Sequence, residues 1–78
     1  MSQEHFDKFV AAAVKMLDVE AAQVTREARF KEELDADSLD LVEFVMELEE
    51  VFGVEMPEEE YQDLKTVGEA FDLLMTKV

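Results

Sequence analysis

The chain has 78 residues with 21 acidic and 7 basic side chains, a formal net charge of −14 and no cysteine. These features exclude disulfides, thiolate metal sites and cysteine nucleophiles, and they disfavour nucleic-acid binding, because phosphate contacts need a basic patch. The N-terminus lacks the features of a signal peptide and no apolar run approaches the ~20 residues of a membrane span, so we expect one cytoplasmic domain over residues 1–78.

Apolar residues at helical spacing predict a first helix over residues 3–17. They follow the i, i+3, i+4, i+7 order and are Phe6, Phe9, Val10, Ala13, Val14 and Leu17. Residues 18–36 lack such a period, but single apolar residues recur there. We therefore expect a long ordered loop that lies across the helices, with a short turn near Thr25 to Ala28.

The next pattern predicts a central helix with Asp37 or Ser38 as its N-cap and Gly53 just past its last apolar residue. Its core stripe is Leu41, Phe44, Val45, Leu48, Val51 and Phe52. A second apolar strip on roughly the opposite side is Leu39, Val42 and Met46, and the acidic band between the two is Asp40, Glu43, Glu47 and Glu50. One helix in so short a chain cannot bury both strips, so the second strip needs a functional explanation.

Two further helices are predicted near the C-terminus. Pro57 favours the start of a short helix that runs to about Asp63. Thr66 and Glu69 have capping-box spacing, which predicts a last helix that ends near Lys77. The expected fold is therefore all-α, a small four-helix bundle with three main helices, one short helix and a long first loop.

The acidic side chains are concentrated in one segment. From Glu32 to Leu64 there are fourteen acidic residues and no basic one. Basic protein surfaces are the expected partners, with an attraction that weakens as salt rises. The simpler interpretation is a charge run that only solvates a helical face.

We predict no enzyme activity and no metal site. Serine hydrolysis needs a base beside the nucleophile, and the single histidine, His5, lies on another helix and is interpreted as a surface side chain. Aspartates near Ser38 have part of the spacing of a calcium loop. However, Leu39, Asp40 and Met46 stand where that loop needs an oxygen ligand, a glycine and a bidentate glutamate.

The residues around Ser38 form an ordered motif. They are Leu34-Asp35-Ala36-Asp37-Ser38-Leu39-Asp40, followed by Val42-Glu43 and by Glu49-Glu50 before Phe52. This motif resembles the prosthetic-group attachment region of acyl carrier proteins. The likeness continues through Val24-Thr25, Phe30, Met56-Pro57 and Thr66-Val67 and so covers nearly the whole chain.

The resemblance implies that Ser38 carries 4′-phosphopantetheine through a phosphodiester, attached by a separate magnesium-dependent phosphopantetheinyl transferase. Acyl groups would then be bound as thioesters on the terminal thiol. It also implies a recognition face for partner enzymes: Asp37, Leu39, Asp40, Val42, Glu43, Met46, Glu47 and Glu50. The acyl chain would lie between the central and last helices, with Val45, Leu48, Tyr61, Leu64 and Phe71 as candidate lining.

Three positions depart from the family pattern. Asp18 and Asp35 stand where glycine is frequent, and aspartate tolerates the left-handed backbone conformation better than most residues. Tyr61 is bulkier than the residue often found beside the acyl pocket, which leaves the length of the sheltered chain open.

The function expected from this resemblance is that of a monomeric, freestanding carrier of acyl chains in fatty acid biosynthesis. One alternative is a specialised carrier for a polyketide, peptidyl or other acyl pathway. Another is an unmodified acidic helical adaptor in which Ser38 is an ordinary helix cap.

Overall fold

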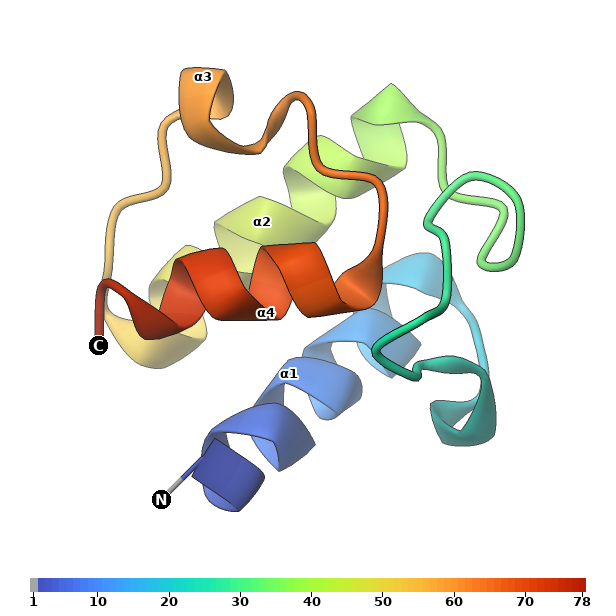
Figure 1. Ribbon diagram of the computed structural model, residues 1–78, viewed down its shortest axis with the longest axis horizontal. Helices are drawn as coiled ribbons and strands as arrows, with labels where there is room; N and C mark the ends of the chain where they lie inside the picture. Colours follow the sequence, from blue (N-terminus) through green and yellow to red (C-terminus); the bar gives the residue numbers. More distant parts are fainter. Residues whose placement is uncertain (1) are drawn as a thin grey trace.

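The computed structural model describes residues 2–78, and these form a helical bundle without strands (Figure 1). Its elements are α1 (Ser2–Leu17), the 3₁₀ helix η1 (Ala21–Gln23), α2 (Ser38–Phe52), α3 (Glu58–Tyr61) and α4 (Val67–Met75). Three longer helices and one short helix confirm the predicted all-α fold. No helix within residues 2–78 has the length and apolar content needed to cross a membrane.

Aromatic rings from three helices form the centre of the core. The Phe9 ring of α1 makes edge-to-face contacts with Phe44 of α2 and Phe71 of α4, at centroid distances of 5.1 and 5.6 Å. Phe6 makes a similar contact with Phe71 at 5.1 Å. Such contacts stabilise the packing beyond the area they bury, so they fix the three long helices against one another.

The long first loop is ordered because it is fastened by both side chains and backbone. Val24, Ala28, Phe30 and Leu34 are buried in the core. The Ala28 N–H donates to the Thr25 carbonyl at 3.1 Å, which confirms the expected turn. The 3₁₀ helix before it was not predicted.

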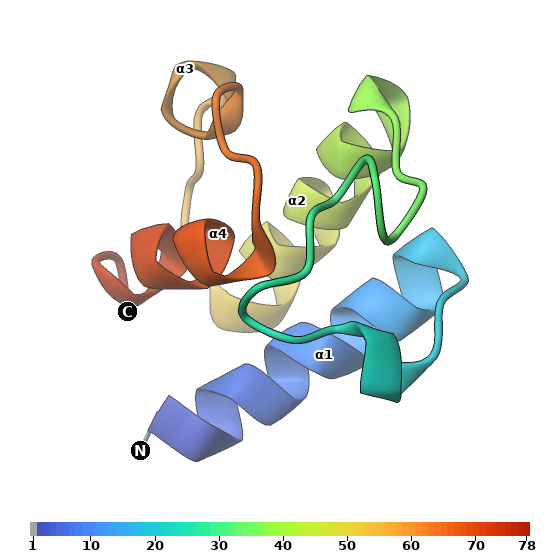
Figure 2. The ribbon, with the colours of Figure 1, turned by 45° about the vertical axis from the view of Figure 1, so that its right-hand side comes forward.

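The same loop is joined to the segment that precedes α4 (Figure 2). The Phe30 N–H donates to the Lys65 carbonyl at 3.0 Å, and the Val67 N–H donates to the Ala28 carbonyl at 2.9 Å. Arg29 and Thr66 form an isolated antiparallel bridge between them. Residues far apart in the sequence are therefore held side by side on this edge of the bundle.

Positive φ angles occur at the predicted positions. Gly53 ends α2 in the left-handed conformation with φ 66°, and its N–H donates to the Glu49 carbonyl. Asp18 and Asp35 have φ 56° and 53°, as expected for aspartates that replace glycine. Beyond α2, the Glu49 carboxylate accepts the Met56 N–H at 2.8 Å and fixes the extended segment that leads to α3.

Some apolar residues assigned to the core are exposed. Val51 is 43% exposed and Val14 is 37% exposed, so their predicted burial was wrong. Val51 faces a shallow depression lined by Ala11 and Ala12 of α1. These side chains are too short to cover Val51, so the valine remains in contact with solvent.

Helix ends also differ slightly from the prediction. α3 ends at Tyr61 rather than near Asp63, and α4 ends at Met75 rather than near Lys77. The Thr76 and Lys77 N–H groups still donate to the carbonyls of Leu73 and Leu74, so the chain continues as hydrogen-bonded turns.

Candidate functional site

Ser38 is the first residue of α2, but it does not cap the helix. The N-cap is Asp37, whose Oδ1 accepts the Asp40 N–H at 2.9 Å, while Asp40 Oδ2 accepts the Asp37 N–H at 3.4 Å. The Ser38 side chain is exposed, and its hydroxyl makes no hydrogen bond to any residue of the range 2–78. Of the two candidate caps, Asp37 is therefore the one used, and the Ser38 hydroxyl is available for chemistry.

Two opposing electrostatic effects act on an anion attached to Ser38: the start of α2 attracts it, and nearby carboxylates repel it. The free N–H groups at the start of a helix favour a phosphate there. The negative carboxylates of Asp37 and Asp40 repel a phosphate, but each of them accepts a hydrogen bond from a backbone N–H. These hydrogen bonds offset part of their negative charge.

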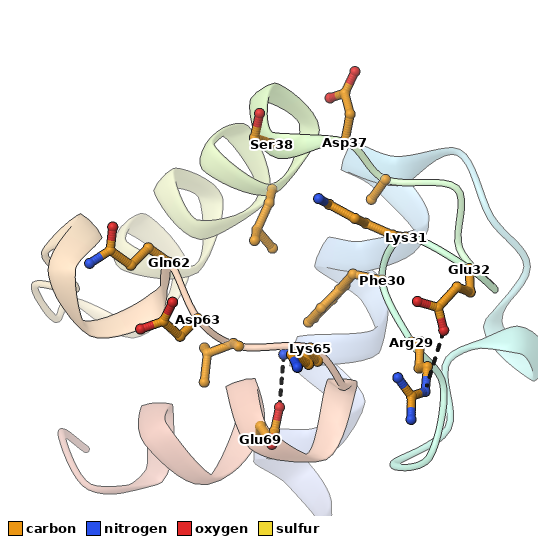
Figure 3. A pocket seen from close by; sticks show the side chains of 13 residues that line it. Arg29, Phe30, Lys31, Glu32, Asp37, Ser38, Gln62, Asp63, Lys65 and Glu69 are labelled. Carbon is orange, nitrogen blue, oxygen red and sulfur yellow. Dashed lines mark hydrogen bonds and ion pairs between the residues drawn. The ribbon is translucent and has the colours of Figure 1, made fainter.

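A groove with a volume of about 730 Å³ begins at Ser38 and runs between the first loop and the α3–α4 connection (Figure 3). Its apolar walls come from the loop, from α2 and from the segment after α3, and are Phe30, Ala36, Leu41 and Leu64. Small-molecule sites typically have volumes of about 300 to 1,000 Å³, so the groove is large enough for a bound chain.

Charged side chains surround this groove. Arg29 Nε pairs with Glu32 Oε2 at 3.4 Å. Glu69 Oε1 accepts the backbone N–H groups of Lys65 and Thr66 at 2.7 and 3.2 Å. These two hydrogen bonds stabilise the ionised form and lower the pKa of Glu69 below its ordinary value.

Two lysines at the groove were not identified as functional residues. Neither Lys31 nor Lys65 has a carboxylate within ion-pair distance of its ammonium group in the part of the chain that the structure describes. The sequence held a signal for them, because these two lysines border the acid-only segment that runs from residue 32 to residue 64. Only the contact between the loop and the α3–α4 connection brings them to the same groove.

The predicted recognition face lies on α2 and is exposed in part. Leu39 and Met46 are 65% and 59% exposed, whereas Val42 is half-buried. Glu43 and Glu50 are exposed and form no ion pair with another described residue. These side chains leave α2 with an apolar strip flanked by free carboxylates.

Glu47 differs from the other acids of this face. Its Oε2 lies 3.3 Å from Lys15 Nζ of α1, and its side chain is only 18% exposed. Lys15 is 32 positions away in the sequence, so the helical wheel of α2 could not indicate this pair. Glu47 is therefore partly neutralised within the chain before any partner approaches.

The five residues predicted to line an acyl pocket do not lie together at the groove. Val45, Leu48, Tyr61 and Phe71 are buried in the core. Leu64, which is half-buried, is the member of this set that lines the groove. Burial, followed by the nearby carboxylates of Glu58 and Glu49, raises the pKa of the Tyr61 phenol above its ordinary value.

No group of three or more histidine, cysteine, aspartate or glutamate side chains is arranged for a metal ion within residues 2–78. The His5 ring lies 5.9 Å from that of Phe52, the last residue of α2. His5 is thus at the opposite end of α2 from Ser38, and it cannot act as a base for the Ser38 hydroxyl.

Comparison with known proteins agrees with this geometry. The family model described as "phosphopantetheine attachment site" matches residues 7–74. The crystal structure of an acyl carrier protein from Thermotoga maritima superposes with a TM-score of 0.83 at 29% sequence identity, over 97% of this chain and 88% of that one. The chain therefore belongs to the phosphopantetheine attachment family and is a carrier protein with the acyl carrier protein fold.

Proposed function

We propose that Ser38 is the attachment residue and that the chain presents acyl thioesters to the enzymes of fatty acid biosynthesis. The observation that carries the proposal is the exposed Ser38 hydroxyl, which Asp37 frees from capping and which opens onto the groove. Chains of this family hold a covalently attached phosphopantetheine. Two of the three threonine hydroxyls are already engaged, since Thr66 caps α4 and Thr76 donates to the Leu73 carbonyl.

The residues at the groove fit this group. Its apolar walls suit the hydrocarbon parts of the pantetheine arm, and the Gln62 amide and the lysines suit its polar parts. Once attached, the arm supplies the only thiol of the molecule, on which acyl groups are held as thioesters. Leu64 and Phe30 then remain candidates for contact with the arm or with a short acyl group.

The attachment reaction requires one nucleophile from this chain. Ser38 Oγ forms a bond to the phosphorus of coenzyme A that bears the pantetheine. The bond from that phosphorus to the bridging oxygen of the nucleotide breaks, and adenosine 3′,5′-bisphosphate leaves. The hydroxyl proton passes to a base of the transferase. The single histidine of this chain, His5, cannot accept it, because His5 lies at the far end of α2. The role of Asp37 and Asp40 is to hold the start of α2 in shape.

The exposed face of α2 supports the carrier role. Leu39 and Met46 provide a small apolar contact, and Glu43 and Glu50 provide charges for arginine and lysine side chains of a partner. Contacts of this kind form quickly, depend on salt and release quickly. The flexible methionine suits a surface that binds several partners in turn.

Intact mass spectrometry tests the attachment site. After incubation with coenzyme A, magnesium and a phosphopantetheinyl transferase, we expect the wild-type chain to gain one phosphopantetheine. Ser38→Ala should gain nothing, and Ser2→Ala, which removes the only other serine, should gain the full mass. An unmodified wild-type chain would favour the adaptor alternative, and a modified Ser38→Ala would place the arm elsewhere.

The pathway is tested separately with the loaded protein. Purified fatty acid elongation enzymes should extend the acyl chain held on the wild-type carrier. A carrier that is modified on Ser38 but is not extended by these enzymes would favour a specialised acyl pathway.

A further inference from the structure

Lys31 is one of three lysines, with Lys8 and Lys65, that have no carboxylate within ion-pair distance among residues 2–78. The remaining basic side chains are paired: Lys15 with Glu47, Arg26 with Asp72, Arg29 with Glu32 and Lys77 with Glu60. The ammonium group of Lys31 instead points into the groove below Ser38, beside the apolar walls (Figure 3). An unpaired ammonium group in the groove that Ser38 also lines is placed to meet an anion attached to that serine.

The backbone holds Lys31 in place on both sides. The preceding residue, Phe30, is buried, and its N–H donates to the Lys65 carbonyl at 3.0 Å. The Phe30 carbonyl accepts the Ala36 N–H at 2.8 Å, which closes the loop on which Lys31 lies. The lysine is therefore presented to the groove from a fixed position rather than from a free loop.

Acidic groups that face the groove do not cancel this charge. Glu32 is paired with Arg29, Glu69 is bound by two backbone N–H groups, and the Asp37 carboxylate is held in the cap of α2. Figure 3 also shows the Asp37 carboxylate directed away from Lys31. Asp63 has no partner within residues 2–78, but it lies with Gln62 on the α3 side of the groove.

We propose that Lys31 binds the phosphodiester of the arm and thereby keeps the arm in the groove while no enzyme is bound. This inference rests on the proposed attachment at Ser38, which bonds the phosphorus directly to the Oγ of a residue that lines the same groove. The contact is exposed and hence weak, so an enzyme that takes up the arm can displace it. Salt weakens it further, because the Debye length is about 8 Å at physiological ionic strength.

Nuclear magnetic resonance of the side chains tests this contact directly. The chain has five lysines, so a protein labelled with ¹³C-lysine gives five sets of Cε–Hε signals, each assigned by one substitution. On conversion from the apo to the holo form, we expect the signals of Lys31 to move most and those of Lys8, which lies at the depression between α1 and α2, to stay in place.

Phosphorus spectra of the holo variants provide the matched control. The phosphodiester signal should shift in Lys31→Met and keep its wild-type position in Lys65→Met, although both lysines line the groove. Lys31→Arg should retain most of the wild-type signal position, because it keeps the positive charge. Circular dichroism checks that each variant is folded, which we expect because Lys31 is exposed.

The outcomes separate this inference from the attachment proposal. Intact mass first establishes that each variant carries the arm, and an unmodified wild-type chain would reject attachment itself. If the arm is present but the Lys31 signals do not move, or if Lys65→Met alone shifts the phosphorus signal, the Lys31 contact is wrong while attachment stands.

Discussion

Substitution of Asp37 and Ser38, one at a time, separates stability from attachment at the start of α2. Asp37→Ala removes the acceptor for the Asp40 N–H, and loss of an N-cap costs about 1 kcal/mol. A change of this size lowers the melting temperature of a 60- to 100-residue domain by about 4 to 8 °C. Removing one negative charge from so acidic a chain relieves some repulsion, so we expect a value nearer the lower end.

Ser38→Ala should have the opposite effects: it should leave the stability nearly unchanged and abolish attachment of the arm. Its hydroxyl makes no hydrogen bond to any described residue, and alanine has a higher helix propensity than serine. The free energy of unfolding should therefore stay within about 0.5 kcal/mol of wild type or rise slightly. At the same time, Ser38→Ala should lose all modification by the transferase.

Urea and thermal unfolding of the apo proteins, followed by circular dichroism, measure the two effects, and intact mass measures attachment. Asp37→Asn is the control for the cap, because asparagine keeps the oxygen acceptor and caps about as well as aspartate. A loss of about 1 kcal/mol in Ser38→Ala, with Asp37→Ala unchanged, would show that serine caps the helix and would refute the argument that its hydroxyl is free.

Two further predictions concern charge. Glu43→Lys should lower the kcat/KM of the transferase about tenfold at low salt, whereas Glu47→Lys should lower it less, because Lys15 already pairs with Glu47; equal losses would contradict this ranking. For Glu69, the lowered pKa means that its ionised carboxylate stabilises the fold above the ordinary value of 4.5, and that this contribution is lost as the pH falls through the folded pKa. The melting temperature of wild type should therefore exceed that of Glu69→Gln at neutral pH and converge with it as the pH falls below 4.5. A difference that does not change with pH would contradict the assignment.

The helices were predictable because their signals are local. Gly53 and the pair Thr66 and Glu69 mark helix ends within a few residues of the elements they bound. The choice between two caps for α2 was left open, although the sequence contains the answer. Asp37 has an aspartate three residues later that can reciprocate, whereas the residue three positions after Ser38 is Leu41, which cannot accept a hydrogen bond.

Features that depend on distant contacts could not be read from the sequence. The exposure of Val51 depends on the short side chains of α1 that face it. The groove depends on the hydrogen bond between Phe30 and Lys65, which are 35 positions apart. Likewise, the pattern of α2 assigned Glu47 to the partner face, but a lysine of α1 determines how much of its charge is free.

The unpaired carboxylates of α2 have two opposing consequences: they lower the stability of the chain, and they are the charges proposed for partner recognition. Only Lys15 reaches the acidic band of α2 in the described residues, so Glu43 and Glu50 keep their charges and repel their neighbours. This repulsion lowers the free energy of unfolding, which is already small in a domain with so small a core. A basic partner bound at the proposed recognition face would reduce this repulsion, so part of the docking free energy would come from relief within the carrier itself. Added salt should screen the same charges in both settings, so we expect it to stabilise the isolated carrier and to weaken a complex with a basic partner. A chain that neutralised this band internally would be more stable and would have little charge left for a partner to recognise.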